Sequence, residues 1–287
     1  NNGALATLTL VFFFWGFIAA GNGIFIPFCR DYFHLDQFQG MLIDFAFYGA
    51  YYLGALGLFI FGSKTGRDLV GGWGYKKSIV FGLIFSALGA GAMIVSLSAN
   101  QFSGMLIGLF IVALGFSLQQ TAANPFMISL GDESTGSSRI NLGGGINSLG
   151  TTLGPLIVAL ALFGTSAAVS ADDIAKLDLN KVIILYAFVG VLFLGIAALF
   201  GFSKKVPAGK NEGKQEPAKK AVVSLLVITG LLIACFSPVF SSYTTKEAKE
   251  IATNEAQIGE MNARIDKQIE ASGITMEDLK KSERTQV

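Results

Sequence analysis

Residues 119–126 read QQTAANPF and follow an almost wholly apolar run over residues 102–118. Lipid disfavours such amides and hydroxyls unless they face protein or water. If the helix leaves the bilayer near Leu130, Gln120 lies about 15 Å inside at 1.5 Å per residue, close to the middle of a core roughly 30 Å thick. This stretch therefore predicts a polar site halfway along a membrane-spanning helix.

A second amide follows on the next apolar stretch, which begins near Arg139 and runs back through the membrane. Asn147 lies eight residues into that stretch, at a depth of about 12 Å. Asn124 shares a helix face with Gln120 because the two residues are four positions apart. We therefore expect the amides of Gln120 and Asn147 to meet near the midplane in a shared wet pocket, where amides suit the hydroxyls of a sugar.

The composition excludes a soluble globular chain. Of the 287 residues, 52% are hydrophobic and 14% are charged, and the mean hydropathy is +0.57. Such values are typical of a protein that crosses the membrane several times. Seven stretches are long and apolar enough to do so. They are residues 5–28, 40–62, 78–97, 103–129, 140–164, 181–202 and 221–243.

The loops between these spans carry their lysines and arginines mainly on one side. Eleven lie on the side of the amino terminus and three on the other, which by the positive-inside rule places the amino terminus in the cytoplasm. The eleven are Lys64, Arg67, Lys76, Lys77, Arg139, Lys204, Lys205, Lys210, Lys214, Lys219 and Lys220, and the three are Arg30, Lys176 and Lys181.

Several motifs together resemble one known family. Residues 120–126 and the positions after them are similar to the fourth and fifth helices of the fucose/glucose/galactose symporters of the major facilitator superfamily. The resemblance extends over residues 12–205. The further matching positions are Phe14-Trp15-Gly16, residues 22–27, Ala46-Phe47-Tyr48, Leu130-Gly131, Glu133-Ser134, Arg139, Asn141-Leu142 and Asn147-Ser148.

The resemblance implies an all-α membrane protein of the major facilitator superfamily. We expect residues 1–203 to form a six-helix half built from two three-helix repeats. Residues 204–220 are then a cytoplasmic linker, and residues 221–243 form an additional transmembrane helix. Because the number of spans is odd, residues 244–287 are expected to be a charged helical segment outside the cytoplasm.

The expected partners follow from this architecture. A facilitator rocks two six-helix halves about a central site, so we expect the second half in the same, longer chain or in a partner chain. Membrane lipid and a sugar substrate are the other expected partners. The sequence has no basic patch with interleaved aromatics, so nucleic acid is not expected as a partner. In the tail, Ile251, Ile258 and Ile265 recur every seven residues, which permits either a short coiled coil or a solvated helix.

Substrate binding is expected of five residues: Trp15, Asn22, Gln120, Asn124 and Asn147. Trp15 lies at the depth of Gln120, where its ring can stack on the apolar face of a sugar, and packing bulk is the alternative. In the resembled symporters the position of Gln120 holds a glutamate that takes the proton, and that of Gly23 holds an aspartate. Neither carboxylate is present here, which leaves proton coupling open.

Asp44 is the candidate ion-coupling residue, for H⁺ or Na⁺. It lies about 6–9 Å inside the second span at 1.5 Å per residue, and a carboxylate within a membrane is costly unless it is paired or functional. Asn22 on the antiparallel first span is expected at a similar depth, as a hydrogen-bond partner. An interfacial acid that reaches water is the alternative, and transport without a coupling ion stays open.

Two cytoplasmic loops are candidate gates. The predicted gating residues are Arg67, Asp68, Asp132, Glu133 and Arg139. Residues 63–77 occupy the place of the superfamily's signature loop, whose charges would latch against a neighbouring helix. In the second loop, Arg139 paired with either acid would form another latch. Simple solvated loops are the alternative in both places.

These features predict secondary active transport of a monosaccharide or similar polyol across a bacterial inner membrane, by alternating access and coupled to H⁺ or Na⁺. The sequence holds no phosphate-binding loop, no nucleophile with a matching base and no cysteine–histidine metal spacing, so neither an enzyme nor a cofactor is expected. The alternative is a non-transporting subunit, derived from a facilitator, that scaffolds a membrane complex through its tail.

Topology reporters test the predicted orientation. A phosphatase that is active only outside the cytoplasm is expected to work when fused after Gly164 and to be inactive when fused after Ser203. A fluorescent protein that matures only in the cytoplasm should give the reverse pattern. Phosphatase activity after Ser203 would contradict the orientation.

Overall fold

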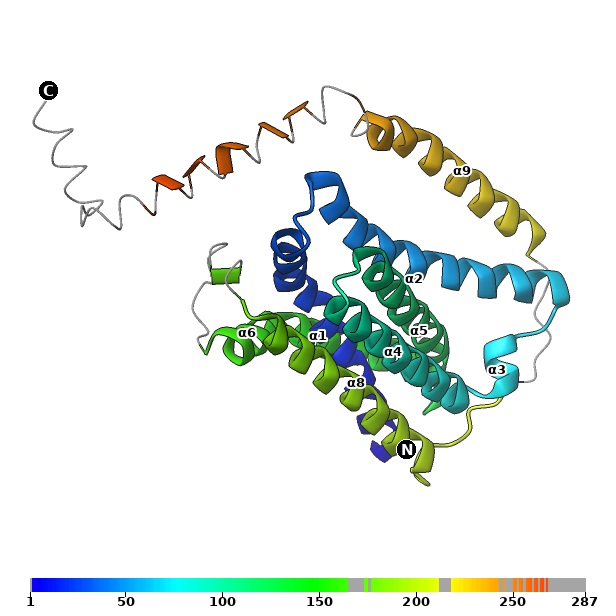
Figure 1. Ribbon diagram of the computed structural model, residues 1–287. Coiled ribbons are helices and arrows are strands. Elements are labelled where there is room, and N and C mark those ends of the chain that lie inside the picture. Colours follow the sequence, from blue (N-terminus) through cyan, green and yellow to red (C-terminus); the bar gives the residue numbers. More distant parts are fainter. Residues whose placement is uncertain are drawn as a thin grey trace, which may run out of the picture. The chain divides into compact units, whose positions relative to one another are not determined.

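A computed structural model describes residues 2–164, 173–174, 177–211 and 218–242, and part of the tail. The described tail residues are 245, 250–251, 253–254, 257–259, 261–262, 264–265 and 267. Within these residues every regular element is a helix (Figure 1). The elements are α1 (Asn2–Tyr32), α2 (Gln37–Thr65), α3 (Leu69–Trp73), α4 (Tyr75–Ser98), α5 (Phe102–Ser129), η1 (Glu133–Thr135), α6 (Gly136–Phe163), α8 (Leu179–Phe202) and α9 (Lys219–Ser242).

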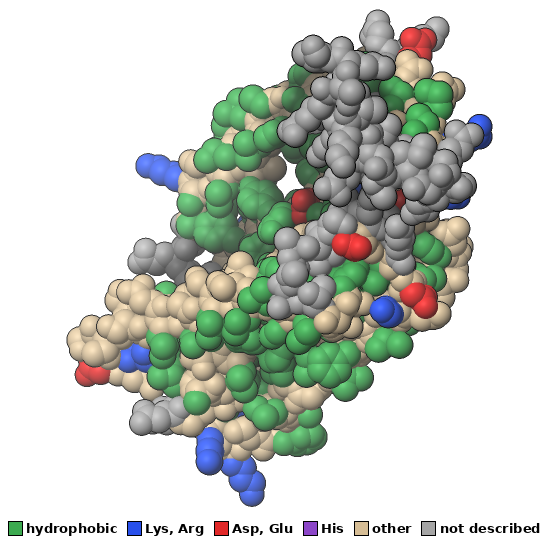
Figure 2. Space-filling model, turned by 90° about the vertical axis from the view of Figure 1, so that its left-hand side faces the viewer, with side chains coloured by type: hydrophobic (Ala, Val, Ile, Leu, Met, Phe, Trp, Pro, Cys, Tyr) green, Lys and Arg blue, Asp and Glu red, His purple; other side chains and the backbone are tan. Residues whose placement is uncertain are grey.

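Seven of these helices are long and apolar enough to cross a membrane: α1, α2, α4, α5, α6, α8 and α9. The seven predicted spans and the all-helical fold class are thereby confirmed. Hydrophobic side chains cover much of the surface that is visible in Figure 2. The sequence does not predict α3, a helix of five residues within the loop after α2.

The chain divides into two compact units, Asn1–Val227 and Ile228–Val287, and the division falls within α9. In the first unit α5 packs against α4 and α2, α6 packs along α1, and α8 packs against α4. Helices of the first predicted repeat therefore pair with helices of the second. In the second unit Ile251, Ile258 and Ile265 are helical and exposed, so the coiled coil stays a prediction.

Glycines let α4 and α5 approach each other closely (Figure 1). A Cβ atom at Gly82 of α4 would lie 2.7 Å from the carbonyl oxygen of Gly115 on α5, and one at Gly89 would lie 2.7 Å from that of Gly108. Because lipid tails are as apolar as the helix surface, close contact between small residues is a main source of helix association in membranes. The α4–α5 pair thus forms a tightly packed support for residues 119–126.

A second glycine contact joins α1 and α6. A Cβ atom at Gly150 of α6 would overlap the carbonyl oxygen of Phe13, and one at Gly16 of α1 would overlap the carbonyl oxygen of Asn147. The two backbones therefore interlock at one level. This contact places Asn147 directly against the turn of α1 that contains Trp15.

Within the first unit, the first part of the predicted linker, residues 204–220, packs on α3 and the start of α4. The N–H group of Tyr75, at the start of α4, donates to the carbonyl oxygen of Gly209 at 3.1 Å. The N–H group of Asn211 donates to the carbonyl oxygen of Gly71 in α3 at 3.0 Å. The first N–H groups of a helix have no partner within it, so this segment supplies acceptors for two of them in α4, those of Tyr75 and Lys76.

The α1–α6 contact predicts different costs for two alanine substitutions on the same helix. Gly150→Ala forces a side chain against the α1 backbone, and overpacking of this kind costs roughly 1–3 kcal/mol. Gly145→Ala is the control, because a Cβ atom there meets nothing within 4 Å. Thermal unfolding in detergent should show a lower midpoint for Gly150→Ala only. Equal midpoints would contradict the packing.

Candidate substrate site

The two neighbouring glutamines of α5 face different helices. Gln119 is fully buried, and Gln120 is half-buried. Successive residues of an α-helix point about 100° apart, because the helix has 3.6 residues per turn. Gln119 accordingly bonds to α1 and α4, whereas Gln120 bonds to α2.

Gln119 joins three helices through a chain of hydrogen bonds. The indole N–H of Trp15 on α1 donates to Oε1 of Gln119 at 3.0 Å. The Nε2 amide group of Gln119 donates to the hydroxyl of Ser86 on α4 at 3.1 Å. That hydroxyl donates to the carbonyl oxygen of Val112 at 3.0 Å. The Trp15, Gln119 and Ser86 side chains are all buried, and their polar groups find partners inside the span, as lipid requires.

Gln120 has one partner and retains unused donors. The hydroxyl of Tyr51 on α2 donates to Oε1 of Gln120, and both side chains are half-buried. Among the described residues the Gln120 amide nitrogen has no hydrogen-bond acceptor. An amide with free N–H groups beside a phenol hydroxyl can bind a ligand rich in hydroxyl groups.

Asn147 is bonded to the backbone of α1. Its Nδ2 group donates to the carbonyl oxygen of Phe12 at 3.1 Å. Gln120 and Asn147 are therefore not bonded to each other, and the wet pocket that both amides are expected to face stays a prediction. Asn147 bonds to α1 because α6 packs mainly along α1, although it follows α5 in the chain.

The other predicted substrate residues lie in three different settings. Trp15 is only 4% exposed, and its ring centroid lies 4.6 Å from that of Phe12, so its face is covered in this conformation. Asn124 is exposed on α5, one helical turn after Gln120. Asn22 belongs to α1, but its side chain lies outside the described residues.

Asp44, the predicted ion-coupling residue, is exposed on α2. It makes no hydrogen bond or ion pair with the side chains that the structure describes, and the expected bond to Asn22 involves a side chain beyond them. Tyr51 follows seven residues later, so Asp44 and the partner of Gln120 share a face of α2. A carboxylate without a partner on this face can hold a cation.

Arg67 and Asp68 do not pair with each other. Arg67 is exposed, and the Asp68 carboxylate accepts a hydrogen bond from the N–H group of Gly71 at 2.9 Å. Asp68 thereby caps the amino terminus of α3, an arrangement that typically stabilises a helix by about 1 kcal/mol. Its gating role stays a prediction.

The Arg139 guanidinium bonds to backbone carbonyl oxygens at the end of α5 and not to a carboxylate. Its Nε group donates to the carbonyl oxygen of Met127 at 2.8 Å, and Nη2 donates to the carbonyl oxygens of Ile128 and Asp132. The last carbonyls of a helix have no partner within it, and the guanidinium supplies donors for them. In the described part of the chain Arg139 forms no ion pair with the carboxylate of Asp132 or Glu133.

The Asp132 carboxylate is occupied within its own loop. It accepts hydrogen bonds from the Ser134 hydroxyl at 2.6 Å and from the Ser134 N–H group at 2.9 Å. These bonds, and to a smaller degree the charge of Arg139, hold the pKa of the Asp132 carboxyl below its usual value. The predicted ion pair between Arg139 and an acid of this loop is therefore replaced by bonds to Ser134 and to backbone carbonyls. A gating role of the loop stays a prediction.

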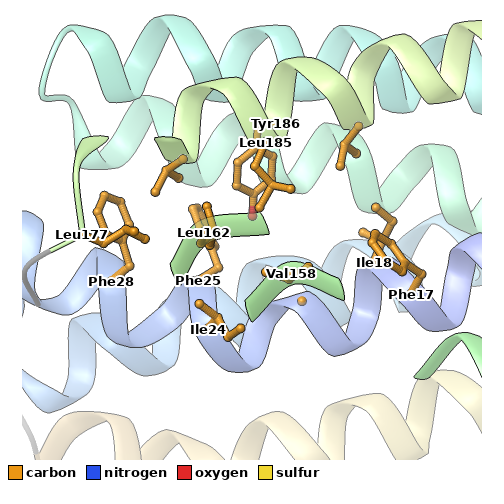
Figure 3. A pocket seen from close by; sticks show the side chains of 13 residues that line it. Phe17, Ile18, Ile24, Phe25, Phe28, Val158, Leu162, Leu177, Leu185 and Tyr186 are labelled. Atoms are coloured by element: carbon orange, nitrogen blue, oxygen red, sulfur yellow. The ribbon is translucent and has the colours of Figure 1, made fainter. Parts of the chain in front are cut away.

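An apolar cavity lies between α1, α6 and α8 (Figure 3). Its volume is about 40 Å³, far below the roughly 300–1,000 Å³ typical of small-molecule pockets. Its walls include Phe17, Phe25, Val158 and Leu162, and the Tyr186 hydroxyl points in among them. The cavity is too small and too apolar to hold a sugar.

Three residues of the site are not predicted from the sequence: Ser86, Gln119 and Tyr51. Ser86 lies four residues after Gly82 on a small-residue face, where packing alone accounts for it. Gln119 directly precedes the predicted substrate residue Gln120 in the same polar run. Tyr51 could have been found, because it shares a helix face with Asp44.

Known proteins resemble this chain over much of its length. No family model matches it. The chain is 37% identical over 209 residues to a glucose/galactose transporter of Brucella abortus, a match that covers 73% of this chain and 48% of that protein. It is 36% identical over 165 residues to the L-fucose-proton symporter of Escherichia coli, over 58% of this chain and 34% of the symporter. The chain thus spans about half the length, or less, of these relatives.

A solved structure supports the same relationship. FucP, a major facilitator superfamily transporter crystallised in the outward conformation, is similar with a TM-score of 0.55 and 30% identity. The match covers 71% of this chain and 50% of FucP. These relatives are transporters and not enzymes, and the resemblance and fold class predicted from the sequence are confirmed.

The bonds of Arg139 predict an effect of a substitution that keeps its charge. Arg139→Lys replaces the planar guanidinium, which donates to several acceptors at once. The end of α5 then loses hydrogen bonds, and the free energy of unfolding should fall by about 1–3 kcal/mol. The control is Arg67→Lys at an exposed position. Thermal unfolding in detergent measures both. A midpoint for Arg139→Lys that equals the control would show that these bonds contribute nothing.

Proposed function

Since this chain belongs to the fucose/glucose/galactose transporters of the major facilitator superfamily, in the region of their amino-terminal half, we propose that it supplies one six-helix half of a sugar transporter. The transporter carries a monosaccharide or similar polyol across a bacterial inner membrane by alternating access. The amino terminus lies in the cytoplasm, and the second half belongs to the same, longer chain or to a partner chain.

The Gln120 amide is the observation that carries this proposal. It lies on α5 with Tyr51 as its partner and with unused N–H donors. Asn124 extends the same face of α5 by one turn and is exposed. Sugar hydroxyls both donate and accept hydrogen bonds, so neutral amides and a phenol suit them without the desolvation cost of a charge.

Asp44 provides the coupling ion site in this proposal. Its carboxylate is unpaired among the described residues and lies on the face of α2 that carries Tyr51. A proton would neutralise it, and Na⁺ would bind it together with amide, carbonyl or water oxygens. The free energy of the ion gradient then drives accumulation of the sugar.

The two cytoplasmic loops act as gates during alternating access. Asp68 fixes the short helix α3, and Arg139 fixes the junction of α5 and α6. Both loops therefore have a defined shape that a second six-helix half can contact and release. Arg67 and Glu133 are exposed in these loops and supply charges for that contact.

Uptake into liposomes tests the proposed activity. The natural full-length polypeptide that carries this sequence is reconstituted and offered labelled L-fucose, D-glucose or D-galactose. Gln120→Ala should raise the KM for the sugar about tenfold, because a few hydrogen bonds to the substrate are lost. Asn180→Ala, an exposed residue at the outer end of α8, is the control. If no sugar is taken up under any gradient, the protein is the alternative non-transporting subunit.

The role of Asp44 has a separate test. Asp44→Asn keeps the shape of the side chain and removes its charge, so accumulation driven by a pH or sodium gradient should be lost while exchange of sugar across the membrane continues. The same liposomes measure both processes. Undiminished accumulation by Asp44→Asn would remove Asp44 from the mechanism.

A further inference from the structure

The side chain of Gln119 is costly for the protein to bury. It is 0% exposed, and a buried amide without partners costs several kcal/mol, roughly 2–7 by transfer measurements. A leucine or methionine would fill the same space without that risk. The amide therefore has a role in its directed hydrogen bonds and not in packing alone.

The orientation of this amide is fixed by its two partners. An indole N–H can only donate, so it needs the oxygen of Gln119. The Ser86 hydroxyl uses its proton on the carbonyl oxygen of Val112, so it accepts from the Gln119 nitrogen. Rotating the amide by 180° would place donor against donor. The chain of bonds consequently has a single direction, from α1 through α5 to α4.

This chain of bonds holds one turn of α1 in place. Trp15 is bonded to Gln119 on one side of that turn. The carbonyl oxygen of Phe12, one turn earlier, accepts the bond from Asn147. Gly16 lies against the backbone of Asn147. The turn formed by residues 12–16 is therefore held by α5 through Gln119 and by α6 through Asn147.

We propose that Gln119 is a positioning residue for the sugar site. Gln119 does not touch the substrate. It fixes the α1 turn to which Asn147 is bonded, and so fixes the position of Asn147 relative to Gln120, the next residue of α5. Without the bond between Trp15 and Gln119, the α1 turn shifts and the distance between the Gln120 and Asn147 amides is no longer set. This inference rests on the proposed function, since it assigns Gln119 to the same site.

Trp15 is its own reporter for this test. The chain has two tryptophans, and the other, Trp73, is 45% exposed in α3. Trp73→Phe leaves Trp15 as the single emitter, and the full-length polypeptide is used with any further tryptophan also replaced by phenylalanine. On this background Gln119→Met keeps the volume and removes both hydrogen bonds of the amide. Ser86→Ala keeps the Trp15–Gln119 bond and removes the two bonds of the Ser86 hydroxyl.

Gln119→Met should shift the emission of Trp15 to shorter wavelength, because the indole loses its acceptor, and should raise the KM for the sugar about fivefold with little change in maximal rate. Ser86→Ala should leave the Trp15 emission and the KM within twofold of the parent, even if the midpoint of thermal unfolding falls as far as for Gln119→Met. That separation is what a merely structural role would not produce.

Two results would overturn the assignment. If Gln119→Met keeps the parent KM, or if KM in both variants simply follows the loss of thermal stability, Gln119 does not position the site. If the parent itself takes up no sugar, the proposed function fails and the positioning role of Gln119 fails with it. In that case the emission of Trp15 still shows whether the bond exists.

Discussion

Lipid offers no hydrogen-bond partner, so a polar side chain within a span is stabilised by a partner in the protein or by contact with water. Gln119 meets this requirement through Trp15 and Ser86, and Asn147 meets it through the carbonyl oxygen of Phe12. Glycines at the α4–α5 and α1–α6 crossings bring the backbones close together where the Gln119–Ser86 and Asn147–Phe12 bonds form. The arrangement of the first unit follows from these two conditions together.

Because polar groups inside a span need hydrogen-bond partners, two adjacent residues of α5 differ in their environment. Gln119 uses its amide to connect helices and is completely buried, whereas Gln120 keeps donors that no described residue accepts. An unsatisfied amide at this depth is tolerated only beside water or a polar ligand. Within residues 2–164, 173–174 and 177–211, a buried amide that bonds to two other helices thus lies beside an amide that keeps unused donors.

The sequence predicts the number of spans because the length of an apolar run is a local property. The depth of the amides in the membrane, expected from the constant helical rise, stays a prediction. The sequence does not predict the bonded partner of each amide: Asn147 bonds to α1 because Gly150 lets α6 approach the backbone of α1 closely. Likewise an arginine beside two acids indicates an ion pair, but Arg139 lies at a helix end whose carbonyls need donors.

The central claim is that the face of α5 around Gln120 is wet and meets the substrate. Asn124→Cys tests it most directly, in a chain whose exposed Cys235 is replaced by serine and whose Cys29 is buried. A membrane-impermeant thiol reagent should modify this cysteine, and added sugar should slow the reaction, whereas a cysteine at the exposed Phe188 of α8 should stay unmodified. Equal inertness at both positions would show that lipid covers this face and would contradict the account.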